Sequence, residues 1–233
     1  MRTMKSVVAS VTILLIGTSA FAQLKKSDIE KLNEAATVLT EIRNAPDNGI
    51  PESIWDKAQC VVVIPDLKKA GFIIGGEHGS GVMSCKHAKT WGPPIFMELT
   101  KGSFGFQAGI QSADLVLIVM NQSGVEKLLG NKVTLGADAS IAAGPVGRTA
   151  TAATDAQLSA EMLSYSRTKG LFAGIDLSGG SLGPDASMNA RMYGPNASAK
   201  DIALGTTRVK MSTEARAFTN ALGRETRGTS GVK

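Results

Sequence analysis

Residues 69–85 read KAGFIIGGEHGSGVMSC, a stretch in which glycine recurs at positions 71, 75, 76, 79 and 81. The stretch resembles either a phosphate-binding loop or the bend of a β-hairpin. A dinucleotide site needs Gly-x-Gly-x-x-Gly between a strand and a helix, and a P-loop ends in Gly-Lys-Ser/Thr; neither spacing is present. The residues that follow, Val82–Cys85, are typical of a strand. We therefore predict a hairpin whose glycines supply tight turns and positive φ angles.

Short apolar runs rich in β-branched residues surround this hairpin, and turn residues separate them at short intervals. This spacing favours antiparallel meanders over βαβ units. Glycine accounts for 26 of 233 residues, and a glycine inside a strand permits a bulge, a sharp bend or a close backbone approach. We predict an α+β fold: a single domain with a strongly curved, glycine-rich antiparallel sheet, barrel- or sandwich-like, and flanking helices. The predicted strands are 60–64, 71–76, 82–85, 95–99, 104–110, 115–120 and 133–143.

Helices are predicted on both sides of the strand-rich region. Ser27 to Glu30 fits a capping box, and apolar residues recur at helical spacing from Ile29 to Ile42, before Pro46 and Gly49 end the pattern. The other predicted helices are a short one after Pro51, then 125–129, 154–165, 199–204 and 213–222. Residues 224–233 are predicted to be a flexible tail.

The first 22 residues have the pattern of a secretory signal peptide. Arg2 and Lys5 precede an apolar run, and Ala20 to Ala22 fits a cleavage site. The run is shorter than the roughly 20 apolar residues that span a bilayer. We expect an exported protein, periplasmic or secreted, with its domain in residues 23–223. Without the leader, 23 basic residues face 20 acidic ones, and their scattered positions argue against nucleic acid as a partner.

The residues that carry chemistry do not form a catalytic or metal-binding pattern. Cys60 and Cys85 bracket a predicted hairpin in a compartment that permits disulfides, and the sequence leaves their pairing open. His78 and His87 do not stand at zinc-ligand spacing with these cysteines. Ser181 lies in Gly-Gly-Ser-Leu-Gly, but a nucleophile elbow leads into a helix and precedes its histidine, and this segment does neither. We predict no enzyme, no metal site and no cofactor.

Several linked segments together resemble the SYLF domain family. The resemblance covers residues 52–205, and its most specific part is AAGPVGR followed by YSRTKGLFAG. The matching segments are AQCVVVIPDLKKAGFIIGGEHGSGV (58–82), WGPP (91–94), FGFQAGIQSADLVLIVMN (104–121), TLGADASIAAGPVGR (134–148), YSRTKGLFAGIDLSGGSL (165–182), and Asn189 with Tyr193 and Gly194.

This resemblance implies a lipid-binding domain without catalytic activity. In eukaryotic relatives it implies acidic lipids, phosphoinositides among them, and in some of these relatives actin and endocytosis. The chain has an export signal and no attached SH3 or FYVE domain, so it resembles an exported, bacterial-type member that is not expected to meet actin. The alternative is a structural or protein-interaction module of the cell envelope that binds no lipid.

Basic residues are the expected contacts with an anionic lipid or membrane surface. Each contributes about 1 kcal/mol near such a surface, screened by salt. Arg148 and Arg167 lie inside the family-like motifs, so lipid contact and structural ion pairing both remain open for them. The candidate residues are Lys68 and Lys69, with Lys25 and Lys26 as helpers, and Arg148 and Arg167.

Overall fold

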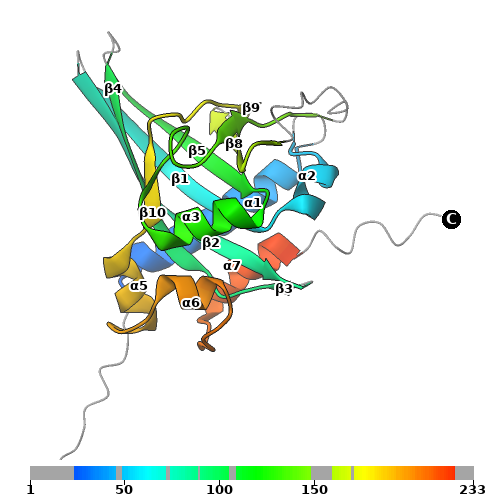
Figure 1. Cartoon of the computed structure of the whole chain (residues 1–233). Helices are drawn as coiled ribbons and strands as arrows, with labels where there is room; N and C mark the ends of the chain where they lie inside the picture. The colour runs from blue at the N-terminus through cyan, green and yellow to red at the C-terminus, as the bar shows by residue number, and fades with distance from the viewer. Residues whose placement is uncertain are drawn as a thin grey trace, which may run out of the picture.

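The computed structural model describes residues 24–45, 49–71, 74–88, 90–104, 109–147, 159–168 and 171–223. These residues form one strongly curled sheet with helices on both faces (Figure 1). The strand order is β6-β10-β4-β2-β1-β5-β8-β7, with β3 beside β2 and β9 beside β8. The predicted α+β fold with a curved, glycine-rich sheet is confirmed.

The elements follow the chain in this order. The strands are β1 (Cys60–Gly71), β2 (Ile74–His87), β3 (Thr90–Trp91), β4 (Ile95–Phe104), β5 (Gly109–Val119), β6 (Val133–Thr134), β7 (Ile141–Ala143), β8 (Met162–Thr168), β9 (Leu171–Gly174) and β10 (Ser181–Pro184). The helices are α1 (Lys26–Arg43), α2 (Glu52–Lys57), α3 (Gln122–Gly130), α5 (Ala186–Tyr193), α6 (Ala199–Ala203) and α7 (Thr213–Gly223).

Strand β1 is buried on both faces, which explains the unbroken apolar run CVVVI. Val61 and Val63 belong to a core that also contains buried residues of α1, α2 and α7. Val62 and Ile64 belong to a second core, which contains residues of α3 and α6. Successive side chains of a strand point to opposite faces, so a strand covered on both sides needs apolar residues throughout.

A bulge bends β1 and divides the sheet into two parts. The register with β2 shifts between Val63 and Lys68, and Asp66 has φ 53°. We call Cys60–Ile64, the residues of β2 and β5 paired with it, and the neighbouring strands β7–β9 with Gly144 the anchored part. We call the free end Lys68–Gly71 and its neighbours across the sheet, namely Ile74–His78, Thr100–Phe104 and Gly109–Ser112.

The glycines of β2 do not serve the purpose that the sequence predicted. Gly76, Gly79 and Gly81, whose surroundings the structure describes, do not have positive φ angles, so for these glycines that prediction is wrong. Instead, Gly81 leaves room for the bulge: a Cβ there would lie 2.3 Å from the Val63 carbonyl oxygen. A Cβ at Gly79 would lie 2.6 Å from a methyl group of Ile64. The prediction of close backbone approach within a bent sheet is confirmed.

The sheet departs from the purely antiparallel prediction at one place. Strands β7 and β8 pair in parallel, Ile141 opposite Met162, whereas the other pairings of the described strands are antiparallel. A parallel pair needs a long crossover connection, and residues 144–161 provide one. The single strand predicted at 133–143 is likewise divided into β6 and β7 by a turn that contains Gly136, φ 85°.

One predicted helix is wrong over its last residues, although Ser159 within it is helical. The sequence predicted a helix over 154–165, but Met162–Thr168 forms β8 between β5 and β7. Residues 148–158 lie outside the described residues. The capping-box signal is local, and pairing within the sheet overrides such a local preference.

The remaining predicted helices are confirmed within a few residues. Helix α1 begins at Lys26, and its cap differs from the prediction because the Asp28 carboxylate accepts the Lys25 backbone N–H at 3.0 Å. Helix α5 was missed, although Asp185 caps it by accepting the Met188 N–H at 2.9 Å. Within the described part of the chain, no helix is both long and apolar enough to cross a bilayer. The predicted leader and tail lie outside the described residues.

Candidate functional site

Two successive sets of directly opposed residues place three lysines at the base of the free end. Lys68 on β1 lies opposite His78 on β2, and Lys69 lies opposite Glu77. Glu77 in turn lies opposite Lys101 on β4. Because directly opposed residues share a face and successive ones alternate, Lys69 and Lys101 share one face and Lys68 lies on the other. We call Lys68, Lys69 and Lys101 the lysine collar.

Each β1 lysine of the collar has a carboxylate partner, but the lysine is the more exposed member of each pair. Lys69 Nζ lies 3.2 Å from Glu77, and their side chains are 37% and 12% exposed. Lys68 Nζ lies 3.7 Å from Asp66, with side chains 69% and 47% exposed. Exposed pairs of this kind contribute little to stability. In both pairs the ammonium group is therefore more accessible to solvent than its carboxylate partner.

Lys101 was missed by sequence reasoning, because it stands alone in its strand. Only the register of β2 with β4 places it beside Lys69 across Glu77. Its ammonium group also donates to the Asp176 carbonyl at 3.5 Å. The pKa of Asp176 is lowered, first by hydrogen bonds from Ser178 and to a smaller extent by the charge of Lys101. The run Thr100–Ser103, which contains no apolar side chain, was the one signal that Lys101 belonged to an exposed strand end.

The two α1 lysines are held at a different place. Lys26 is 92% exposed and lies 3.7 Å from Glu30. Next to it, the buried carboxylate of Asp28 binds Arg191 of α5 through contacts of 2.7 and 2.8 Å. The hydrogen bond from Arg191 holds the pKa of Asp28 below its ordinary value, against the opposing effect of burial. The beginning of α1, with Lys25, is thereby fixed against α5.

An acidic groove runs between α1 and the sheet. It has a volume of about 460 Å³. It extends from Glu30, the partner of Lys26, to Asp66, the partner of Lys68. An anionic headgroup would be repelled there, so the lysines of α1 and those of the collar form two separate sites. The charged residues that line the groove are Glu30, Glu34, Glu41, Asp66, Asp114 and Arg167.

Arg167 is a structural ion-pair residue in this arrangement. Its Nε donates to Asp114 at 2.9 Å, a second guanidinium nitrogen lies 2.6 Å from the same carboxylate, and a third contacts Glu41. The arginine therefore ties β8 to β5 and to α1, and its side chain is 22% exposed. The sequence left lipid contact and ion pairing open for this residue, and the structure shows ion pairing. Arg148 lies outside the described residues.

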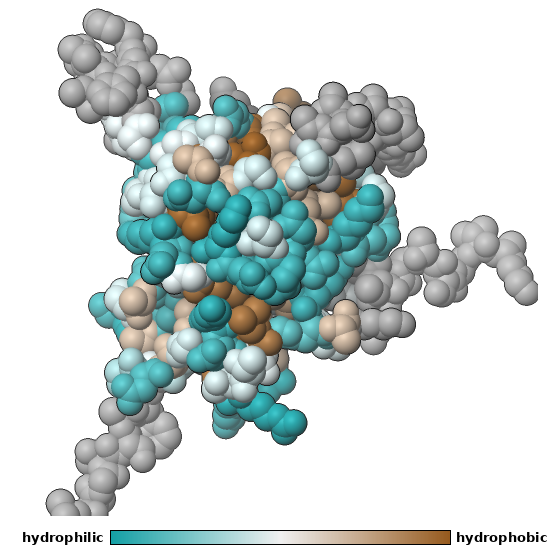
Figure 2. Space-filling view, in the orientation of Figure 1, coloured by the Kyte–Doolittle hydropathy of each residue, from teal (hydrophilic) through white to brown (hydrophobic). Residues whose placement is uncertain are grey.

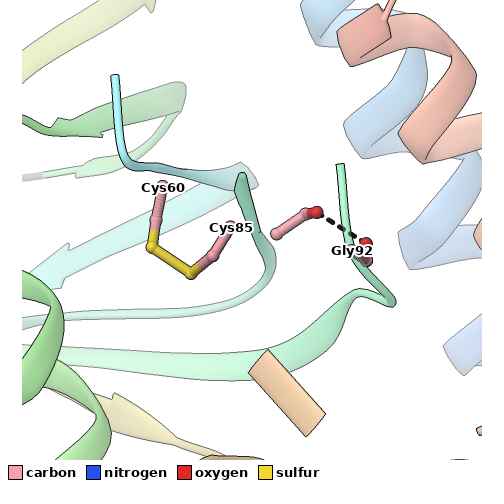
Figure 3. Close-up of a disulfide and its surroundings, with 4 residues drawn as sticks. Cys60, Cys85 and Gly92 are labelled. Carbon is pink, nitrogen blue, oxygen red and sulfur yellow. Dashed lines mark hydrogen bonds between the residues drawn. A yellow bond between two sulfur atoms is a disulfide. The ribbon is translucent and has the colours of Figure 1, made fainter. Parts of the chain in front are cut away.

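Cys60 and Cys85 are joined at the far end of the anchored part. They lie directly opposite each other on β1 and β2 and form a disulfide with a Cα–Cα distance of 3.9 Å (Figure 3). Beside it, the Ser84 hydroxyl donates to the Gly92 carbonyl at 2.7 Å, the contact dashed in Figure 3. This crosslink fixes the pair of strands that carries Lys68 and Lys69 at its opposite end.

The residues examined for catalysis are dispersed. Ser181 is the first residue of β10 and pairs with Thr100 of β4, so its glycine-rich segment does not form a strand-to-helix elbow. His78 lies at the free end, whereas His87 lies where β2 ends, against Gly92 and Gly205. Among the described residues, no group of three or more His, Cys, Asp or Glu side chains is placed to hold a metal ion.

Comparison with known proteins identifies the family. A family model described as "Ysc84: Las17-binding protein actin regulator" matches residues 100–225, more than half of the chain. The chain is 35% identical over 166 residues to LAS seventeen-binding protein 3 of Saccharomyces cerevisiae, which covers 70% of this chain and 36% of the yeast protein. It is 32% identical over 186 residues to human SH3 domain-containing YSC84-like protein 1, which covers 78% of this chain and 54% of the human one.

Rat SH3 domain-containing YSC84-like protein 1 gives a similar match: it is 33% identical to this chain over 184 residues. The chain thus spans about half the length, or less, of these curated relatives. The family model begins near the end of β4 and includes β5 and the elements that follow it as far as α7, but it includes neither β1 nor β2. The resemblance inferred from the sequence motifs is confirmed, and the chain belongs to the Ysc84 family, the family of the SYLF domain.

Proposed function

We propose that this chain binds the surface of an anionic phospholipid layer and catalyses no reaction. The observation that carries the proposal is the lysine collar: three lysines on β1 and β4, with β2 between these strands, of which Lys68 and Lys69 are more exposed than the carboxylates beside them. Lysine ammonium groups at such a position attract headgroup phosphates, each by about 1 kcal/mol, screened by salt. The binding is therefore expected to be weak and reversible.

Export is part of this proposal. The leader pattern in residues 1–22 supports it. The Cys60–Cys85 disulfide supports it independently, since disulfides persist mainly in oxidising compartments such as the periplasm. For an exported chain, the actin regulation named in the family description is not an expected activity. Its partner is then a lipid surface of the cell envelope.

The test is co-sedimentation of residues 23–233, which include every residue that the structure describes, with neutral and anionic vesicles. We expect binding to phosphatidylcholine vesicles only when phosphatidylglycerol is included. We expect that binding to be lost as the salt concentration rises from about 0.05 M to about 0.5 M, because the Debye length then falls well below 10 Å.

A pair of matched variants locates the contact. Lys68→Glu combined with Lys69→Glu should weaken binding to anionic vesicles at least about tenfold. Lys200→Glu combined with Lys210→Glu makes the same change in net charge at two exposed positions of the region around α6 and should change binding little. Equal losses in both variants would show that net charge alone governs binding and would reject the collar. No binding to either vesicle would favour a protein-interaction module of the envelope.

A further inference from the structure

His78 lies beside the lysine collar, and the role inferred for it rests on the proposed lipid binding. It is on β2, directly opposite Lys68 on β1 and Thr100 on β4. Directly opposed residues share a face of the sheet, so the imidazole and the Lys68 ammonium group lie on the same face. The two side chains are 63% and 69% exposed. Both groups are therefore accessible to a surface that approaches the collar.

Two carboxylates near this pair are each held by a lysine. Asp66 lies 3.7 Å from Lys68 Nζ. Glu98 on β4 binds Lys132 Nζ at 2.7 Å through one oxygen, and its other oxygen lies 3.9 Å from His78 Nδ1. A protonated His78 would thus share a carboxylate that Lys132 holds more closely. Protonation therefore adds one net positive charge to a face on which the other charges are already paired.

The other face of the sheet has charges of both signs at the same level. Lys69 lies 3.2 Å from Glu77, which is also opposite Lys101. The charge of Lys101 in turn acts on Asp176. The lysines of the collar are thus partly neutralised by neighbouring carboxylates, and their attraction for an anionic surface is modest. One further positive charge at this level changes that attraction by a large fraction.

Histidine is the side chain whose charge ordinarily changes near neutral pH. It titrates between about pH 5 and 8, whereas lysines and carboxylates ordinarily keep their charges in this range. A protonated His78 is attracted by Glu98 and repelled by Lys68. An anionic surface at the collar favours the protonated ring, and the protonated ring favours that surface by the same factor. Protonation and lipid binding therefore reinforce each other.

Apolar contact is not expected to mask this effect of charge. Among the residues whose side chains the structure describes, Leu171 is the exposed large hydrophobic residue. The face of the molecule shown in Figure 2 is mostly hydrophilic, with small brown patches between teal regions. Binding that depends chiefly on charge responds to each charge that is gained or lost.

We propose that protonation of His78 strengthens the binding of the collar to an anionic phospholipid layer. At about pH 5.5 the imidazole carries a proton and adds to the attraction by the lysines, and at about pH 7.5 it is neutral and the lysines act alone. One basic charge near such a surface corresponds to about fivefold in affinity. The chain therefore binds the surface more tightly at mildly acidic pH than at neutral pH.

The experiment measures co-sedimentation of residues 23–233 at about pH 5.5 and about pH 7.5, at one low salt concentration. The vesicles contain phosphatidylcholine and phosphatidylglycerol, because the phosphodiester of phosphatidylglycerol stays ionised at both pH values. We expect the wild type to bind about threefold to fivefold more tightly at the lower pH. His78→Gln should bind equally at both pH values. His78→Lys at the higher pH should bind as tightly as the wild type does at the lower pH.

The second histidine of the chain provides the matched control. His87 lies where β2 ends, packed against Gly92 and Gly205 rather than beside the collar. His87→Gln should therefore keep the pH dependence of the wild type. Circular dichroism at both pH values checks that each variant remains folded, and the exposed position of His78 favours this for its two variants.

The outcomes distinguish this inference from the proposed function. If the wild type binds anionic vesicles equally at both pH values, or if His78→Gln keeps the pH dependence, the role of His78 is rejected and surface binding through the collar stands. If His87→Gln alone loses the dependence, the contact at the end of β2 is responsible, and the inference is overturned. If the wild type binds no vesicle at either pH, both proposals fail.

Discussion

Glycines in the anchored part of the sheet touch their neighbours, whereas those at the free end face open space. A Cβ at Gly144 would lie 2.1 Å from the ring of Tyr165, and one at Gly174 would lie 2.4 Å from the Gly144 carbonyl. At the free end, a Cβ at Gly102 would meet nothing within 4 Å, and one at Gly76 would approach only a carbonyl at 3.7 Å. In the anchored part glycine therefore permits close packing, and at the free end it leaves the space beside the strands open.

This difference separates the residues that stabilise the fold from the residues that we propose contact a lipid surface. The motif AAGPVGR meets the motif beginning YSRTKG through the contact between Gly144 and the Tyr165 ring, so the most family-specific residues form a packing unit. At the free end, Gly76 and Gly102 make no comparably close contact. Substitutions in the anchored part should therefore alter stability, and substitutions at the free end should alter binding.

The largest effect is expected from Gly144→Ala. The added methyl group would overlap the buried Tyr165 ring, which is enclosed by the sheet and cannot move aside. We expect a loss of about 3 kcal/mol or more in the free energy of unfolding, measured by urea denaturation. Tyr165→Phe is the control: it keeps the ring but removes a buried hydroxyl that has no hydrogen-bond partner among the described residues, so stability should hold or rise. An unchanged midpoint for Gly144→Ala would refute the packing unit.

Glu161 should give an intermediate effect that depends on pH. It accepts hydrogen bonds from Lys127 at 2.9 Å and from the Ser140 N–H at 2.8 Å, where α3 meets the start of β8. Burial alone would raise its pKa, but these contacts and one from Ser123 outweigh burial and lower the pKa from 4.5 to about 2. The ionised form thus stabilises the fold fully above pH 4.5, and this stabilisation is lost as the pH falls through about 2.

Glu161→Gln should accordingly cost about 2 kcal/mol at neutral pH. The difference from the wild type should narrow as the pH is lowered from 6 toward 3, as followed by urea denaturation at each pH. Glu126→Gln, the same change at an exposed position of α3, should change the free energy of unfolding little. If the difference in the free energy of unfolding between Glu161→Gln and the wild type stayed constant with pH, the ionised carboxylate would not be what stabilises the contact between α3 and β8.

Much of the fold could be predicted because its central signals are local. The run CVVVI and the helical spacing in α1 each identify their element from a short window, whereas the predicted strands 71–76 and 82–85 fall largely within one strand, β2. The last residues of the helix predicted over 154–165 form β8 instead, because Met162 and Tyr165 are apolar in either structure and only pairing with β5 decides between them. The purpose of Gly79 and Gly81 also depends on β1, which bends over them.

The candidate site was predicted less completely because its residues come near one another only through the register of the strands. Lys68 and Lys69 are adjacent in sequence and were found, but Lys101 joins them only through the pairing of β2 with β4. Lys25 and Lys26 were expected to help, yet the acidic groove separates their helix from the collar. Such separation depends on how α1 packs against the sheet, and a charge count along the chain does not contain that information.

The smallest effect is expected from Gly102→Ala, the counterpart of Gly144→Ala at the free end. Alanine is favoured over glycine within a strand by roughly 0.5–1 kcal/mol because glycine loses more conformational entropy on folding, and the added methyl group meets no atom within 4 Å. We expect a slight gain in the urea midpoint and unchanged binding to anionic vesicles. A loss of stability comparable with that of Gly144→Ala would show that the free end is packed as tightly as the anchored part, and the division between the two parts would then have to be abandoned.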